Sequence, residues 1–254
     1  ADINTLYASS GFSGLGDQAI TANDTGSIAA STITTVATAN SSGTLNVSAA
    51  GTITGTAAEI IAAFADGTVT EASDVALTVN SGTATLAQAR SLDGLTAGVV
   101  TATIADTVVS DLLGSSPLLD ANGNNAFTIT IGTDDATVAA ADLNTLDGLT
   151  TVAINAGNVT TITSSSLADI NTLYASSGFS GLGDQDITAS DSGSIAASTI
   201  TTIATANSSG TLDVSGAATI TGTAAEIIAA FTDGTVTEAD DVDLTVNSGT
   251  ATLA

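Results

Sequence analysis

Three acidic stretches hold the side chains best suited to bind an ion in this sequence. The turn DANGNN places Asp120, Asn122 and Asn124 at alternate positions around a single glycine. Calcium takes roughly six to eight oxygen ligands from carboxylates, amides and carbonyls, so this spacing resembles the start of a calcium loop. The glycine stands at the wrong position for an EF-hand, and no glutamate closes the loop.

Two further acidic clusters are candidates for the same ion. One is the pair Asp134 and Asp135 in GTDDAT, and the other is the segment EADDVDLTV (238–246), which mixes acidic and apolar residues. In a strand, Val242, Leu244 and Val246 would point inward, and Asp241 and Asp243 would share the outer face about 7 Å apart. The alternative for every cluster is a solvated acidic face with ordinary turn chemistry, and we favour that alternative for any single cluster. The predicted calcium ligands are Asp120, Asn122, Asn124, Asp134, Asp135, Glu238, Asp240, Asp241 and Asp243.

Enzymatic catalysis has few suitable side chains in this composition. The 254 residues include no His, Cys or Lys, so a histidine base, a thiol nucleophile and a lysine nucleophile are all excluded. Pairs of carboxylates can still cleave glycosidic bonds, and a polysaccharide-degrading β-helix therefore stays open as an alternative. A near-identical repeat would duplicate an active site, and aromatic residues make up only 3% of the chain. We therefore predict that the protein is not an enzyme.

The charge limits the possible partners. Arg90 is the single basic residue against 26 acidic ones, which gives a net charge of −25. Phosphate binding needs Lys and Arg, so we expect no nucleic-acid partner, and an anionic membrane surface would repel the chain. No stretch of about 18 apolar residues exists, so we also expect no membrane insertion.

The first 87 residues recur as residues 168–254, with only ten positions changed. A fixed repeat of this kind is typical of a solenoid. Four of the ten changes replace a neutral residue with aspartate, at positions 186, 213, 240 and 243, and none removes an acid. The apolar positions barely change, as in Val36 against Ile203. The pattern indicates a constrained core and a surface that accumulates acid.

A shorter period lies inside the long one. Apolar residues three or four apart predict helices over 57–64, 86–95, 107–113, 140–149 and 167–175, and a weaker, β-branched helix over 32–38. Capping boxes begin several of them, at Thr56–Glu59, Thr85–Gln88, Thr223–Glu226 and, in a weaker form, Ser166–Asp169. Period-two runs between the helices predict strands at 51–55, 75–80, 82–86, 99–104, 126–131, 152–155 and 159–163.

These elements predict a β/α repeat solenoid with coils of about 28 residues, each holding short parallel strands and one short helix. Six coils make the large repeat, residues 1–167, and residues 168–254 are a second, partial copy. We therefore expect residues 1–254 to form one continuous solenoid of about nine coils.

The phrases GTAAEIIAAF, SLADINTL, AAADLNTLDGLT and LTAGVVTATIADT resemble repeats of giant acidic Thr/Ala-rich surface proteins of marine cyanobacteria. The resemblance covers essentially the whole chain, in repeat style and phrasing. It implies an extracellular, cell-surface protein of the adhesin or cell-coat type, with calcium binding and export by a type 1 route. The nonapeptide G-G-x-G-x-D of repeats-in-toxin proteins is absent, so the sequence does not support that particular calcium device.

The functional expectation is an extracellular structural or adhesive repeat array without catalysis, either an excerpt of a longer protein or the subunit of a filament. A calcium-dependent adhesin module that recognises glycans is the alternative from a binding class. The expected partners are copies of the chain itself, end to end or laterally, or cell-surface glycans. Calcium is the one cofactor that the sequence suggests.

Overall fold

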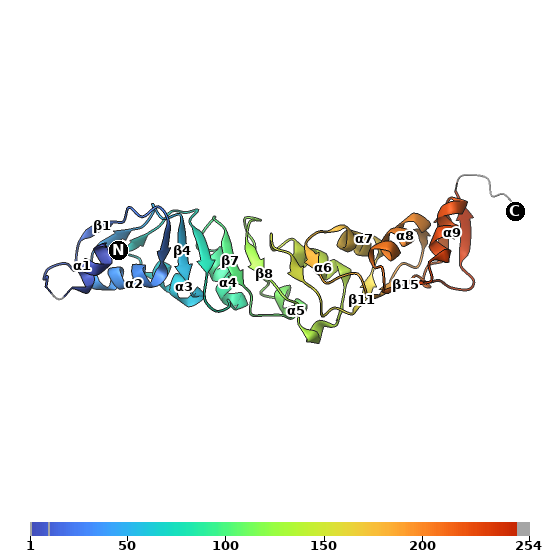
Figure 1. Cartoon of the computed structure of the whole chain (residues 1–254), viewed down its shortest axis with the longest axis horizontal. Coiled ribbons are helices and arrows are strands. Elements are labelled where there is room, and N and C mark those ends of the chain that lie inside the picture. The colour runs from blue at the N-terminus through green and yellow to red at the C-terminus, as the bar shows by residue number, and fades with distance from the viewer. Residues whose placement is uncertain (1, 10, 248–254) are drawn as a thin grey trace. The chain divides into compact units, whose positions relative to one another are not determined.

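The computed structural model describes residues 2–9 and 11–247. They belong to two compact units (Figure 1). The first unit comprises Ala1–Asp106, Gly114–Ile129 and Leu149–Val152, and the second comprises Thr107–Leu113, Thr130–Gly148 and Ala153–Ala254.

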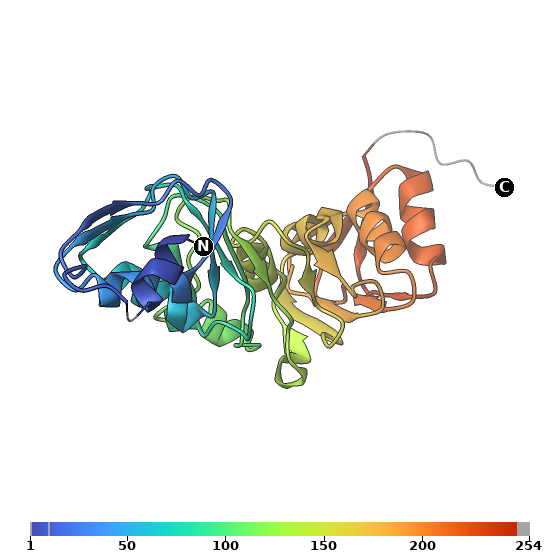
Figure 2. The same cartoon turned by 60° about the vertical axis from the view of Figure 1, so that its left-hand side comes forward.

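Helices follow one another at regular intervals in each unit. The described residues of the first unit contain α1 (Asp2–Ala8), α2 (Ala30–Ala39), α3 (Ala57–Ala65) and α4 (Leu86–Asp93). Those of the second contain α5 (Val109–Leu112), the 3-10 turn η1 (Thr133–Asp135), α6 (Ala140–Asp147), α7 (Leu167–Ala175), α8 (Ala197–Ala206) and α9 (Ala224–Thr232). Successive helices of one unit pack against each other, as Figure 2 shows for α7, α8 and α9.

Short strands separate the helices. The first unit has β1 (Ala19–Thr21), β2 (Ser27–Ala29), β3 (Thr44–Asn46), β4 (Thr52–Gly55), β5 (Val69–Thr70), β6 (Ala76–Val79), β7 (Val100–Thr103) and β8 (Ala126–Thr128). The second has β9 (Thr137–Val138), β10 (Ile154–Asn155), β11 (Thr161–Ser165), β12 (Phe179–Ser180), β13 (Asp186–Ala189), β14 (Ser194–Ala196), β15 (Thr211–Asp213), β16 (Thr219–Gly222), β17 (Val236–Thr237) and β18 (Asp243–Val246).

All strand pairs are parallel, and each sheet lies within one unit. The first unit contains the sheets β1–β3–β5 and β2–β4–β6–β7–β8, and the second contains β9–β11–β13–β15–β17, β14–β16–β18 and β10–β12. Parallel strands that are joined through a helix in every coil form the β/α repeat solenoid that the sequence predicts.

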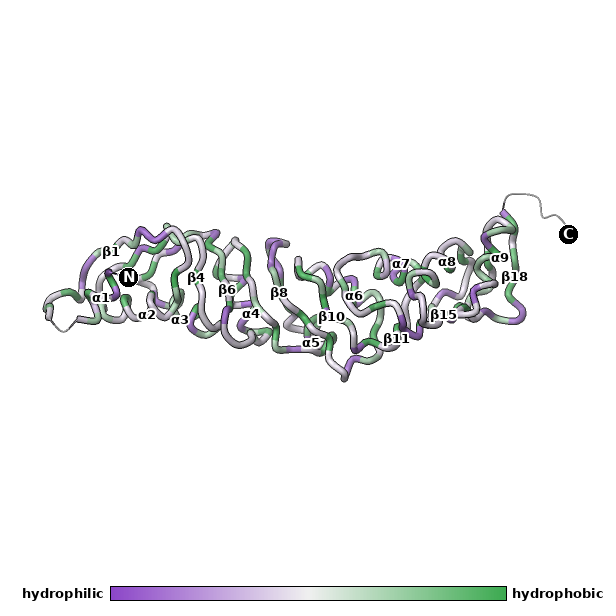
Figure 3. Tube along the Cα trace, viewed as in Figure 1, coloured by the Kyte–Doolittle hydropathy of each residue, from purple (hydrophilic) through white to green (hydrophobic). Residues whose placement is uncertain are grey.

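Equivalent apolar residues stack from strand to strand. Ile28 lies opposite Ile53, and Ile53 lies opposite Leu77. Figure 3 shows apolar and polar residues alternating along the trace, which turns one face of each strand inward. The helices close the core from the other side with small and branched residues, among them Ile60, which is fully buried.

The spacing in sequence between successive helices differs from the spacing between paired strands. Helix starts lie 27 to 31 residues apart within each unit, in agreement with the predicted period of about 28. Paired strand residues lie only 23 to 25 positions apart. A helix is about 10 Å wide and paired strands are about 4.8 Å apart, so the helical side needs the longer path. As a result, β2 ends directly at α2, whereas six residues separate the end of β6 from the start of α4.

The weakest predicted helix, over 32–38, is present as the ten-residue α2, because burial of Ile33 and Val36 stabilises it although no side chain caps it. Two local predictions differ from the structure. The helix predicted over 107–113 is reduced to the single turn α5. The strand predicted over 82–86 is an isolated bridge between Ala84 and Ile104, because the next residue, Thr85, already caps α4.

The predicted capping boxes are present. Thr56, Thr85 and Thr223 each accept a hydrogen bond from the third residue of their helix, whose side chain accepts one from the threonine backbone N–H. Ser166 makes one of the two bonds of a capping box, as expected of the weaker form: its hydroxyl accepts a hydrogen bond from Asp169 N at 3.1 Å. These caps satisfy N–H groups that the helix leaves free.

Candidate functional site

The DANGNN turn is held by its own aspartate. The two carboxylate oxygens of Asp120 accept hydrogen bonds from the backbone N–H groups of Asn124 and Asn125, each at 3.1 Å. Gly123 takes φ +67°, a left-handed conformation that glycine adopts without strain. Asn122 is exposed, and the Asn124 amide donates to the carbonyl oxygen of Ala97. Asp120 therefore acts as a turn former, which is the alternative that we weighed for this cluster.

An acid that the sequence analysis did not single out lies near this turn. Glu71 lines a groove of the first unit together with Asn122 and Thr96. Burial raises the pKa of the Glu71 carboxyl, and a hydrogen bond from its own backbone N–H opposes this effect. Among the described residues, the side-chain oxygen of Asn124 has no hydrogen-bond partner, although it is buried. The structure thus adds one carboxylate to the surroundings of Asn122.

The second predicted cluster, Asp134 and Asp135, lies in η1. Asp135 accepts a hydrogen bond at 2.5 Å from the backbone N–H of Val109, the first residue of α5. Asp134 is exposed. One acid of this pair therefore caps a helix of the preceding coil, and the other faces the solvent.

The third cluster surrounds β18. Asp240, Asp241 and Asp243 are exposed, and Glu238 is half-buried. Leu244 lies opposite the buried Ile220, on the face predicted to point inward, but Leu244 and Val246 remain 53% and 46% exposed. The described part of the chain contains no strand that follows β18 in its sheet.

Metal binding at these positions remains a prediction from the sequence. Within residues 2–9 and 11–247, no three His, Cys, Asp or Glu side chains come together as a group that could hold a metal ion.

Buried amides join successive coils, and the sequence analysis missed them. Asn207 follows α8, and its side-chain oxygen accepts hydrogen bonds from the Gln185 backbone N–H at 3.0 Å and the Tyr174 hydroxyl at 2.9 Å. Its amide donates to the carbonyl oxygen of Gln185 at 2.8 Å. The Gln185 side chain in turn donates to the carbonyl oxygen of Val159, one coil earlier.

We call this set of hydrogen bonds, centred on one asparagine, an asparagine joint. The first copy repeats it with Asn40, Gln18 and Tyr7. A signal for it stands in the sequence as ANSSG, which occurs once in each copy. Gly43 closes the turn that follows Asn40, and it is also needed for space, because a Cβ there would lie 2.3 Å from both the Asn40 amide and the Gln18 carbonyl oxygen.

A different buried pair takes the same role in the middle of the first unit. Asn125 donates to the Asp93 carboxylate at 2.7 Å and accepts a hydrogen bond from Val100 N at 3.0 Å. Both side chains are buried. The other oxygen of the Asp93 carboxylate accepts a hydrogen bond from Ala121 N, so each of its two oxygens has a donor.

Side chains of one coil also cap the helix of the coil before it. The first N–H of α4 donates to Asp106, that of α6 to Ser165, and that of α7 to Asp191 at 2.7 Å. Each residue lies 20 to 25 positions after the group that it caps. An acid at a helix N-terminus also interacts favourably with the helix dipole. These oxygens therefore connect neighbouring coils.

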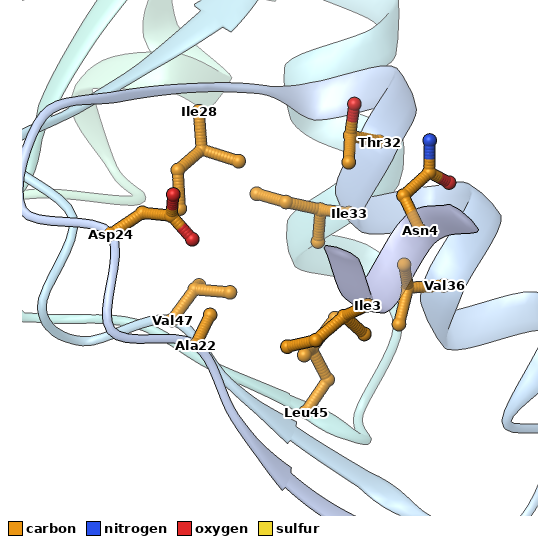
Figure 4. A pocket seen from close by; sticks show the side chains of 10 residues that line it. All are labelled: Ile3, Asn4, Ala22, Asp24, Ile28, Thr32, Ile33, Val36, Leu45 and Val47. Carbon is orange, nitrogen blue, oxygen red and sulfur yellow. The ribbon is translucent and has the colours of Figure 1, made fainter. Parts of the chain in front are cut away.

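The first unit has an apolar groove beside α1 and α2 (Figure 4). Ile3, Ile28 and Val47 line it, and the Asp24 carboxylate lies between Ile28 and Val47. Asp24 occupies the position of Asp191 in the second copy, but it has no hydrogen-bond partner among the described residues.

Searches of protein-family models, curated proteins and solved structures found no match for this chain. None of the helices in the described residues is both long enough and apolar enough to cross a membrane.

Proposed function

We propose that this chain is a structural or adhesive repeat array on the outside of the cell, and that it catalyses no reaction. The observation that carries the proposal is the use of its buried polar side chains. Within the described residues, all seven of them hydrogen-bond to another coil: Asn40, Asp93, Thr96, Asn125, Ser165, Gln185 and Asn207.

The chemistry of these groups supports a mechanical role. A buried polar group that is left unpaired costs about 1–3 kcal/mol, so each joint resists separation of its two coils. A catalytic site needs polar groups that are free to meet a substrate, whereas these seven side chains hydrogen-bond to backbone or side-chain groups of neighbouring coils. The differences between the two copies also add acid to the surface and leave the joints unchanged.

The location can be tested by immunolabelling. Antibodies raised against the purified chain should label intact cells of its source, and prior absorption with the chain should remove the label. Labelling only after permeabilisation would overturn the extracellular placement.

The absence of catalysis has its own test. Incubation of the purified chain with neutral and acidic polysaccharides should release no new reducing ends. Reproducible release that increases with protein concentration would replace this proposal with a glycoside-cleaving enzyme.

A further inference from the structure

The DANGNN turn contains a chemically labile pair of residues. Asn122 precedes Gly123, and no other asparagine in the sequence is followed by glycine. The backbone nitrogen that follows an asparagine can attack the side-chain amide carbon, and a side chain on the following residue hinders this attack. Glycine has no Cβ, so it hinders the attack least and lets the backbone turn most freely. The sequence therefore places an unhindered nucleophile beside one amide.

The structure leaves this amide open. The Asn122 side chain is exposed, and it makes no hydrogen bond among the described residues. Beyond the chain neighbours of Gly123, no described atom lies within 4 Å of the point where a Cβ would stand. The Gly123 N–H donates to the carbonyl oxygen of Asp120 at 3.4 Å, which is longer than the usual range of about 2.7–3.2 Å. Little must be broken before the Gly123 nitrogen can turn toward the amide.

We propose that Asn122 is a site of spontaneous deamidation, which converts it to aspartate and isoaspartate. The Gly123 nitrogen attacks Cγ of Asn122, the new C–N bond closes a succinimide ring, and the amide nitrogen leaves as ammonia with the proton of the Gly123 N–H. Water then adds to either ring carbonyl carbon, and the C–N bond to that carbon breaks. Attack at Cγ gives aspartate, and attack at the backbone carbonyl carbon gives isoaspartate. Water is the only co-reactant, and nothing is oxidised or reduced.

Other asparagines are better protected. Asn40 and Asn207 precede serine, both are buried, and their amides are held in the asparagine joints. Asn80 is exposed, but the residue that follows it, Ser81, carries a side chain that hinders the attack. Exposure and a following glycine coincide only at Asn122. The order of reactivity that we expect is therefore Asn122 first, then Asn80, and the two joints last.

An aspartate in place of an asparagine is compatible with this fold. The two copies show the same exchange at Asn46 and Asp213. Each of these side chains accepts a hydrogen bond from the backbone N–H two residues later, at 2.9 Å from Ser48 and at 2.8 Å from Ser215. The carboxylate thus keeps the bond that the amide makes. Asn122 has no such bond to lose, so we expect the aspartate product to remain folded.

The product changes the charge of the groove that Asn122 and Glu71 line. Aspartate has an ordinary pKa of about 3.9 and is ionised at neutral pH, so each event adds one negative charge. The new carboxylate opposes ionisation of Glu71, because like charges disfavour each other. The surface then gains acid as the molecule ages, in the direction of the aspartates that distinguish the second copy. The inference goes beyond the proposed structural role and does not rest on it.

Mass spectrometry and isoelectric focusing of the purified 254-residue chain test the proposal during incubation at neutral and mildly alkaline pH. We expect a mass shift that grows with time and corresponds to the exchange of an amide NH₂ for a hydroxyl, together with a more acidic band. Alkali should accelerate both, because the attacking nitrogen must lose its proton. Fragmentation should locate the shift at Asn122, and enzymatic methylation of isoaspartate should label the same fragment.

Matched variants at two exposed asparagines identify the source of the acidic band. Asn122→Gln should lose the band, because glutamine must close a larger and slower-forming ring, whereas Asn80→Gln should keep it. Asn122→Asp should carry the added charge from the start, and circular dichroism checks that each variant is folded. An unchanged mass after prolonged alkaline incubation, a shift located at another asparagine, or an acidic band that persists in Asn122→Gln would overturn the inference.

Discussion

The two copies of the 87-residue segment are an internal comparison within one polypeptide. Their helices, strands and caps coincide after a shift of 167 positions, from α2 and α8 to β6 and β18. Their burial does not coincide, because a side chain such as Ile20 is covered only where a preceding coil packs on it. Local structure in this protein is therefore set by the coil itself, and burial is set by the neighbours of the coil.

The largest difference in stability between the two copies is expected for Leu77 and Leu244, which occupy equivalent positions. Leu77→Ala should cost about 2–5 kcal/mol, because a fully buried side chain leaves a cavity. Leu244→Ala should cost less than about 1 kcal/mol, because half of the side chain is already in water. Repeat proteins open in parts, so hydrogen exchange of the β6 and β18 amides is the suitable measurement. Equal losses of protection would contradict the burial difference.

The asparagine joints should give the next largest difference. Asn207→Ala leaves the backbone groups of Gln185 unpaired in a buried site, at a cost of about 1–3 kcal/mol. Asn40→Ala removes the same bonds, but Gln18 is exposed, and water can replace the lost partner. Urea unfolding should therefore show a larger loss of stability for Asn207→Ala. A larger loss for Asn40→Ala would mean that coverage by the preceding coil adds nothing to the joint.

The comparison also explains which features could be predicted from the sequence. Helix starts and capping boxes depend on residues within one turn, so Thr56, Thr85 and Thr223 could be identified from spacing alone. The stacking of coils followed from the repeat itself. The exposure of Leu244 could not be predicted, because it depends on whether another strand covers β18.

The predicted ion-binding residues illustrate a second limit. Asp120 and Asp135 were selected as acids in turns, and the structure places both as acceptors of backbone N–H groups. A carboxylate that holds a turn and one that awaits a cation have the same sequence pattern. The joints of Asn40 and Asn207 were missed for a related reason, since their partners lie 22 positions earlier in the sequence.

Acid should distinguish the capping boxes of the two copies from that of α4. Backbone and side-chain hydrogen bonds from Thr56 lower the pKa of Glu59 below its ordinary value of 4.5, and Thr223 does the same for Glu226. Their contribution is therefore present above the ordinary pKa and is lost as the pH falls through the lowered one. The box of α4 uses Gln88, which does not titrate. Amide exchange at the start of α3 and α9 should increase in acid more than at α4.

A matched variant tests the cause. Glu59→Gln should make the start of α3 as insensitive to acid as that of α4 and leave α9 unchanged. If all three helix starts respond equally to acid, the capping carboxylates are not responsible.

The smallest expected effect is a difference between the pKa values of the two tyrosines. It tests whether the preceding coil also buries the tyrosine hydroxyl that bonds to the asparagine. Burial and then the charge of Asp184 raise the pKa of Tyr174 above its ordinary value of 10.0, and burial and then Asp17 raise that of Tyr7. The Tyr174 hydroxyl lies 2.9 Å from the side-chain oxygens of both Gln185 and Asn207 and can donate its one proton to either, whereas the Tyr7 hydroxyl donates to Asn40. A raised pKa means that the stabilising contribution is complete below the ordinary value and is lost as the pH rises through the folded one. Single-tyrosine variants separate the two groups. Ultraviolet absorbance should show that Tyr174, the tyrosine left in Tyr7→Phe, ionises at a higher pH than Tyr7, the tyrosine left in Tyr174→Phe. Coincident titrations of the two folded variants would show that both hydroxyls have the same surroundings.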